Sequence, residues 1–275
     1  MKKKLSGKSL IKELRIEPGS RARLRDKDAD RVFGWSKEEG EKVFAETREE
    51  LTRLQYKLYA DGRYPVLIVL QATDGAGKDS TVQHVMTAFN PQGCIVTSFK
   101  APTSEELKHD YLWRIHRRLP ARGEIGVFNR SHYEDVLIVR VDGLVPEDIW
   151  RKRYEQINDF ERMLTENGTR VIKFFLQISK DEQLRRFQDR LDDPTKQWKF
   201  NADDIAKRKQ WDQYQAAYED ALTQCSTRWA PWHVIPADRK WFRNLAVGQI
   251  LAHELGKLPL RFPEASFDPS KIRLR

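Results

Sequence analysis

The chain has 275 residues and a mass of 32.4 kDa, which suits one large α/β domain with a sizeable core. Its 50 basic and 41 acidic residues give a formal charge of +9, which favours a polyanionic partner such as a nucleic acid, a nucleotide or another phosphate chain, unless the excess serves only solubility. Two distant cysteines exclude a disulfide framework and zinc-ligand spacing, and the longest apolar run, 66–70, is too short to span a bilayer. We therefore expect a soluble, cytoplasmic protein without membrane attachment.

The first part of the chain predicts an arm followed by a helix. Residues 1–35 are basic, polar and rich in turn formers, which indicates an N-terminal arm that wraps the folded domain. From 36 to 60, apolar residues recur on one helical stripe. Ser36 and Glu39 form a candidate capping box at the start of this helix, and Gly62 follows its predicted end.

Strands and helices alternate through the rest of the sequence. Strands are expected at 65–71, 94–99, 124–128, 171–178 and 232–235. Helices are expected from 81 onward and at 104–119, 146–166, 181–191, 203–223 and 241–255. This alternation predicts an α/β fold, a parallel sheet of about five strands with helices on both faces. Ligands of such sheets bind beyond the carboxyl ends of the strands.

A glycine-rich loop at 72–80 connects the first buried strand to a helix. Gly75 and Gly77 let the backbone amides converge at the N-terminus of that helix, where the helix dipole favours an anion. Lys78 adds a cation that can follow a phosphate through transfer. The loop therefore predicts a phosphate site, against the alternative of a tight turn with no ligand.

The same loop departs from the usual phosphate-loop pattern. Ala72 occupies the position of the first glycine, and Asp79 stands where Ser or Thr usually holds magnesium, with Ser80 one position later. Asp74 lies inside the loop, where a carboxylate repels phosphate unless a metal ion lies between them. Asp74 is accordingly the candidate metal ligand.

A second polar run, 129–135, follows the strand at 124–128 and is expected at the same sheet edge as the loop. Arg130 can bind a phosphate bidentately, whereas Glu134 or Asp135 can hold a metal, a ribose or a protonated group. The alternative is a surface ion pair between Arg130 and Glu134. For His132 we favour a packing role over a catalytic one.

A third set is a basic helix that runs into a polar segment. Arg186 and Arg190 are four residues apart and share a helix face, and Lys199 follows Pro194. This pattern is typical of a mobile lid at about 181–202, which would deliver cations to a transferring phosphate and keep water out. Neighbouring aspartates could instead neutralise these arginines on a solvated face.

Aromatic residues at helical spacing are more often core, so no ligand is assigned to Trp113, Trp198 or Trp211.

The three sets together resemble the polyphosphate kinase 2 family, a branch of P-loop kinases similar to thymidylate kinase. The resemblance rests on 74–79, on 128–134 and on the lid arginines, with supporting phrases at 54–60, 90–93 and 99–103. It spans about 40–258. The expected organisation is an arm at 1–35, a P-loop kinase domain at 36–258 that includes the lid, and a tail at 259–275.

The family transfers phosphoryl groups between inorganic polyphosphate and nucleotides, and the resemblance implies roles for matching residues. Lys78 would hold polyphosphate or the transferring oxygens, and Asp74 would bind Mg²⁺ (Mn²⁺ as a substitute) or orient the acceptor phosphate. Arg130 would hold the nucleotide phosphate, and Arg190 with Arg186 would close over the transferring group. The expected catalytic residues are Asp74, Lys78, Arg130 and Arg190. The expected phosphate- and nucleotide-binding residues are Gly75, Gly77, Asp79, Ser80, Asn129, Glu134, Arg140, Arg186 and Lys199.

One departure from the family pattern bears on the acceptor. Many members read Asp-Arg-Ser-Trp-Tyr-Asn where this chain has Asn129, His132 and Glu134. This version looks like the family's class III, whose members phosphorylate both AMP and ADP. The expectation is a Mg²⁺-dependent, reversible polyphosphate:nucleotide phosphotransferase that gives ADP and ATP, a homo-oligomer without nucleic-acid or membrane partners. The alternatives are an ATP-dependent nucleotide or small-molecule kinase and a basic, non-enzymatic nucleic-acid-binding protein.

Overall fold

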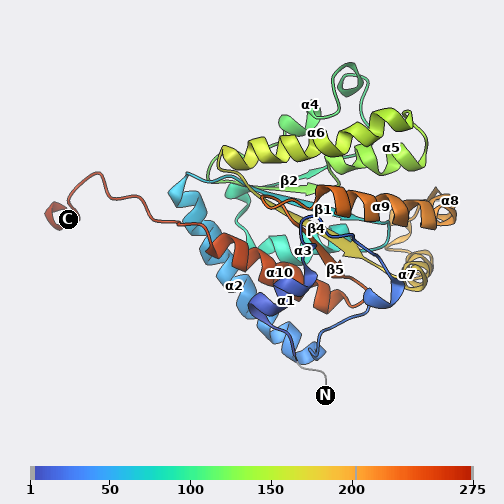
Figure 1. Cartoon of the computed structure of the whole chain (residues 1–275). Helices are drawn as coiled ribbons and strands as arrows, with labels where there is room; N and C mark the ends of the chain where they lie inside the picture. Colours follow the sequence, from blue (N-terminus) through green and yellow to red (C-terminus); the bar gives the residue numbers. More distant parts are fainter. Residues whose placement is uncertain (1–3, 202, 274–275) are drawn as a thin grey trace.

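The computed structural model describes residues 4–201 and 203–273. Residues 1–3, 202 and 274–275, which fall within the predicted arm, lid and tail, lie outside the described residues. Figure 1 shows a central sheet between two helical layers. Among the described residues, no helix has both the length and the apolar character needed to cross a membrane.

The sheet has five strands in the order β2-β3-β1-β4-β5, and every neighbouring pair is parallel. Their bounds are β1 Val66–Ala72, β2 Cys94–Ser98, β3 Ile125–Asn129, β4 Arg170–Gln177 and β5 Trp232–Pro236. β1 is buried at every position because helices cover both of its faces. The predicted five-strand parallel sheet is confirmed.

The helices are divided between the two faces of the sheet. Their bounds are α1 Gly7–Leu14, α2 Lys37–Asp61, α3 Lys78–Val85, α4 Trp113–His116, α5 Ile138–Val141, α6 Glu147–Glu166, α7 Lys180–Asp192, α8 Asp203–Lys209, α9 Trp211–Cys225 and α10 Lys240–Gly256. Ile68 and Leu70 of β1 pack in one core with α1, α2 and α10, whereas Leu67 and Val69 pack in the other with α6 and α9. This division follows from the alternation of side chains along a strand.

The predicted cap of α2 is confirmed. The hydroxyl of Ser36 accepts from the backbone N–H of Glu39 at 3.3 Å, and the Glu39 carboxylate accepts from Ser36 N at 3.3 Å. The helix ends at Gly62, whose φ of 66° is the left-handed conformation that glycine adopts at little cost.

Two predicted helices are wrong in extent. The segment 104–119 forms only a 3₁₀ turn and the four-residue α4, because Thr103 and Asp110 hydrogen-bond to nearby backbone N–H groups in competition with a continuous helix. The predicted helix at 203–223 is divided into α8 and α9 at Gln210, which leaves the helical conformation.

The ends of the chain differ in how they associate with this domain. The predicted arm contains α1, which the sequence pattern did not reveal, and Leu10, Ile11 and Leu14 of α1 are buried against the core. Ile16 N donates to Trp232 O at 2.9 Å, so this segment follows β5. The chain after residue 260 extends away from the body of the molecule (Figure 1).

Candidate functional site

The register of the sheet places two of the predicted segments side by side. Leu70 of β1 lies opposite Asn129 of β3, so the loop after β1 and the polar run after β3 leave the sheet at the same edge. Arg130 N donates to Leu70 O at 3.1 Å directly beyond this point. Arg130 has a φ of 62°, a left-handed conformation that is uncommon outside glycine and asparagine and that concentrates at functional sites.

The glycine loop has the conformation that its two glycines permit. Gly75 and Gly77 have φ values of 84° and 103°. A Cβ atom at Gly77 would lie 2.0 Å from Nη1 of Arg243, so that position accepts only glycine on both conformational and steric grounds. Ala76 N donates to Thr73 O at 3.3 Å, and α3 starts at Lys78.

Lys78 is folded back over this loop. Its Nζ donates to Ala72 O at 2.8 Å and lies 3.7 Å from Asp74 Oδ1. Burial lowers the pKa of Lys78, and the Asp74 carboxylate opposes that shift. The ammonium therefore stays close to the loop carboxylate.

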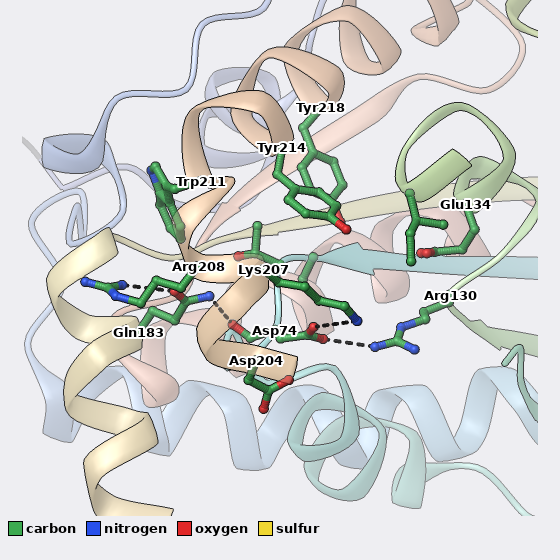
Figure 2. A pocket seen from close by; sticks show the side chains of 13 residues that line it. Asp74, Arg130, Glu134, Gln183, Asp204, Lys207, Arg208, Trp211, Tyr214 and Tyr218 are labelled. Carbon is green, nitrogen blue, oxygen red and sulfur yellow. Dashed lines mark hydrogen bonds and ion pairs between the residues drawn. The ribbon is translucent and has the colours of Figure 1, made fainter. Parts of the chain in front are cut away.

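Asp74 is the electrostatic centre of the site. Its carboxylate lies 2.9 Å from Arg130 Nη2, 3.7 Å from Lys78 Nζ and 3.8 Å from Lys207 Nζ. Burial alone would raise the pKa of Asp74, but these three cations outweigh it and hold the pKa below its usual range. Figure 2 shows the pairs with Lys207 and Arg130.

The alternative in which Arg130 forms a surface ion pair with Glu134 is wrong, because the guanidinium pairs with Asp74 in a cavity that Glu134 also lines. Burial raises the pKa of Glu134, and the charges of Arg130 and Lys78 partly oppose this increase.

His132 lies behind the site. It is fully buried, with Nε2 3.3 Å from Glu161 Oε1, which confirms the predicted packing role.

The cavity beside Asp74 has one charged and one aromatic wall. The cavity is partly open to solvent, and its free volume at the scale of a water molecule is about 50 Å³. Its lining residues are Ala72, Thr73, Asp74, Arg130, Glu134, Ile138, Gln183, Asp204, Lys207, Arg208, Trp211, Tyr214 and Tyr218. Figure 2 shows Tyr214 and Tyr218 of α9 above the row formed by Lys207, Asp74 and Arg130. Such a pair of walls fits a ligand with both a flat and an anionic part.

Sequence reasoning missed the contribution of α8 and α9. Trp211, Tyr214 and Tyr218 share a helix face, but this spacing is also typical of core residues. Trp211 and Tyr218 serve both purposes, since each is nearly buried and each lines the cavity. Lys207 carried no signal in the sequence beyond its charge.

Arg190 and Lys199, the other two cations of the predicted lid, lie outside the cavity wall. Arg190 lies 3.7 Å from Asp204, and Asp204 lines the cavity, so Arg190 is separated from it by one side chain. Lys199 is exposed, with Nζ 5.1 Å from the ring of Trp198. Neither cation lines the cavity in this structure.

Two expected phosphate ligands are bound elsewhere, which corrects their placement. Arg186 donates from Nη1 to Gly75 O and Ala76 O at 3.0 and 3.1 Å, from Nη2 to Ala237 O and Asp238 O at 2.6 and 2.9 Å, and from Nε to Glu182. All its N–H groups are used, so it supports the loop from behind instead of closing over a phosphate. Arg140 pairs with Asp220 at 2.7 Å and is absent from the cavity wall.

The remaining predicted residues lie at the base of the loop. Asn129 Nδ2 donates to Asp79 Oδ1 at 2.6 Å, which joins the end of β3 to the first turn of α3. Ser80 Oγ accepts from Arg243 Nη2 at 3.0 Å. The side chains of Asn129, Asp79 and Ser80 therefore bind other protein groups, and they do not line the cavity.

The donor set of the site fits one mode of magnesium binding. Among residues 4–201 and 203–273, no group of three or more His, Cys, Asp or Glu side chains could hold a metal ion. Mg²⁺, however, usually keeps several waters and binds through one or two carboxylates together with substrate phosphates. Asp74 and Glu134 in the cavity wall fit that mode.

Residues 34–260 match the family model for polyphosphate kinase 2. The chain belongs to the polyphosphate kinase 2 family. It is 48% identical over 264 residues to an AMP/ADP-polyphosphate phosphotransferase of Meiothermus ruber, covering 95% of this chain and 99% of that protein. It is 47% identical to an ADP-polyphosphate phosphotransferase of Rhodopseudomonas palustris, covering 85% of each chain.

The fold is shared with a solved member of the polyphosphate kinase 2 family. The crystal structure of polyphosphate kinase 2 from Arthrobacter aurescens matches with a TM-score of 0.92 and 45% identity, over 97% of this chain and 96% of that one. The predicted family and its P-loop kinase fold are therefore confirmed. The chain is an enzyme, a phosphotransferase, and the non-enzymatic nucleic-acid-binding alternative is rejected.

Proposed function

We propose that this polyphosphate kinase 2 transfers the end phosphoryl group of inorganic polyphosphate to AMP and to ADP, giving ADP and ATP, and that the reaction is reversible. One observation carries the proposal: Asp74 of the glycine loop contacts Lys78, Arg130 and Lys207, from three separate segments, within 4 Å at the wall of one cavity. The names of the relatives in Meiothermus ruber and Rhodopseudomonas palustris support the choice of donor and acceptors.

The glycine loop and the cavity beside it suit the two substrates. The amides of the glycine loop and Lys78 would hold the donor, because an anion is favoured at the N-terminus of α3. Arg130 and Lys207 face the same cavity and would hold the acceptor phosphates. The aromatic wall of α9, with Tyr214 and Tyr218, leaves an apolar surface for the nucleobase.

The chemistry requires positioning and electrostatics more than proton transfer. An oxygen of the acceptor's terminal phosphate attacks the end phosphorus of polyphosphate in line, and the bond to the bridging oxygen breaks, leaving a chain shorter by one unit. That nucleophile is largely ionised near neutral pH, so no strong general base is needed. Lys78 and Arg130 would stabilise charge on the equatorial oxygens, and each such donor is worth roughly 3–4 kcal/mol of barrier.

Magnesium, with manganese as a substitute, is part of the proposal. Asp74, with Glu134 nearby, would hold the ion against the substrate phosphates. Bound there, it would neutralise phosphate charge and leave the loop cations free to bind oxygens. Arg190 would join the site when the lid moves, because Asp204 lies between it and the cavity in this structure.

The deciding experiment uses AMP, Mg²⁺ and polyphosphate with no other nucleotide. We expect ADP to form first and ATP to form after it. Chromatography of the nucleotides measures both products over time. A parallel reaction contains ATP as the donor in place of polyphosphate, and a non-adenine nucleoside monophosphate as the acceptor in place of AMP. Product formation only in the second reaction would favour the ATP-dependent kinase and contradict our proposal.

We also infer a homo-oligomer in a reducing, cytoplasmic environment. β2 is an outer strand of the sheet, and its Ile95 and Val96 are 52% and 44% exposed, which favours contact with another copy. Cys94 and Cys225 are both free thiols, which supports a reducing compartment. Light scattering of the purified protein tests the oligomeric state, and a monomer at micromolar concentration contradicts it.

A further inference from the structure

The glycine loop rests on a buried arginine from the last helix. Arg243 of α10 is fully buried, and its Nη2 donates to Ser80 Oγ at 3.0 Å. Its Nη1 donates to Ala76 O at 3.4 Å, and Nη2 also binds the side chain of Asn244 at 2.8 Å. α10 thereby reaches both the loop and the first turn of α3.

Arg243 has no carboxylate partner among residues 4–201 and 203–273. Among the described residues, no Asp or Glu oxygen forms an ion pair with it, whereas Arg186 beside it pairs with Glu182. Burial, with the charge of Arg186, lowers the pKa of Arg243 to about 9. A buried cation without a counter-ion is costly, and a bound anion nearby reduces that cost.

The contact of Arg243 with the loop is also close. A Cβ atom at Gly77 would lie 2.0 Å from Arg243 Nη1 and 3.8 Å from Arg186 Nη1. The two guanidinium groups therefore pack directly against the backbone of the loop.

These contacts set the direction of one peptide group. Ala76 O accepts from Arg186 at 3.1 Å and from Arg243 at 3.4 Å, and the chain has no cis peptide bonds among the described residues. In a trans peptide the C=O and the following N–H point in opposite directions. The N–H of Gly77 therefore points away from the arginines and finds no backbone acceptor in the described part of the chain.

We propose that Arg243 is a positioning residue for the oligophosphate donor: it holds the peptide between Ala76 and Gly77 with its N–H toward the donor, and its unpaired charge lies beneath the loop until the donor supplies the anion. This inference rests on the proposed function, because it assumes that a phosphate chain binds the loop. It gives α10, which is remote from the cavity in sequence, a direct part in donor affinity.

The test measures tripolyphosphate binding without nucleotide, by calorimetry at two salt concentrations. The variants are Arg243→Gln, which removes the charge, and Arg243→Lys, which keeps it but loses the paired contacts. Arg239→Gln is the matched control, because Arg239 precedes the same helix, is exposed and pairs with Asp30. We expect the dissociation constant to rise at least tenfold in Arg243→Gln and three- to tenfold in Arg243→Lys, with a weaker salt dependence in Arg243→Gln only.

Kinetics distinguishes positioning from a purely structural role. The KM for polyphosphate should rise in parallel with the dissociation constant, and kcat per folded molecule should change less than threefold. If Arg243→Gln does not fold, the dissociation constant and KM of Arg243→Lys test the inference. Binding and KM within twofold of the wild type in the folded Arg243 variants would overturn the inference. Failure of the wild-type protein to bind tripolyphosphate would instead contradict the proposed function.

Discussion

The carboxylate of Asp74 lies 2.9 Å from the guanidinium of Arg130, although 56 residues separate them in the sequence. The parallel register of β1 and β3 accounts for this contact, because it brings the ends of the two strands level. Asp74 therefore pairs with the cations that bind phosphates in the proposed function.

Replacing Lys78 by Met should lower kcat/KM about 100-fold or more, as expected when a donor to a transition-state oxygen is lost. The fold should persist, because Nζ makes one hydrogen bond, to Ala72 O. Lys42→Met, at an exposed site on α2, is the control. Coupled ATP formation and circular dichroism measure the two effects, and substantial residual turnover would refute the assignment.

Asp74→Asn should have opposite effects on binding and on turnover. Without the carboxylate, Lys78, Arg130 and Lys207 are freed, so tripolyphosphate should bind more tightly in EDTA. With Mg²⁺, kcat should fall at least tenfold because the proposed metal ligand is lost. Calorimetry and steady-state rates test this, with the exposed Asp212→Asn as control. Weaker binding in EDTA would show that Asp74 does not compete with phosphate.

Glu134→Asn should change the ratio of the AMP and ADP rates. Glu134 lines the cavity close to Arg130, and its carboxylate could help place a second cation that lets either acceptor occupy the phosphate positions. Initial rates with each acceptor give the ratio, and Glu134→Gln separates the loss of charge from the loss of length. An unchanged ratio in both variants would make this idea wrong.

Arg190 and Arg140 should differ in importance. Arg190→Gln should lower kcat at least tenfold, because Arg190 belongs to the predicted lid and only the side chain of Asp204 separates it from the cavity. Arg140→Gln should keep activity within threefold of the wild type, because Arg140 pairs with Asp220 outside the cavity wall. Steady-state kinetics of both variants decides, and a larger loss in Arg140→Gln would restore its expected phosphate role.

His233 should make the stability of the protein depend on pH. Burial lowers the pKa of His233 to about 4, from a usual value of 6.5. Between these two pH values the unfolded chain binds more protons, so the free energy of unfolding decreases as the pH falls, by about 2 kcal/mol at pH 5. Urea denaturation at pH 8 and pH 5 measures this contribution.

His233→Gln should remove that part of the pH dependence, while His109→Gln, at a more exposed histidine, should leave it unchanged. The same decrease in all three proteins would assign the pH dependence to other groups. His233 Nδ1 lies 3.3 Å from Lys173 O, so the Gln side chain keeps a polar partner within reach.

Several features of the fold could be predicted from local sequence. The five strands are short apolar runs between polar segments, and β1 is buried throughout, as its composition predicts. The cap at Ser36 and the stop at Gly62 depend on residues a few positions apart. The prediction of a helix at 104–119 was wrong because the side chains of Thr103 and Asp110 accept hydrogen bonds from nearby backbone N–H groups and interrupt the periodic pattern.

The sequence by itself determined the parallel sheet, the glycine loop and the polar run after β3, because burial periodicity and turn chemistry act over short distances. Only the tertiary structure decided where the long cationic side chains end. Arg186 and Arg243 lie beneath the loop and Lys207 lies in the cavity, although all three are equally basic in sequence. A flexible side chain takes its partner from whatever elements pack around it, and those elements come from positions more than 100 residues away.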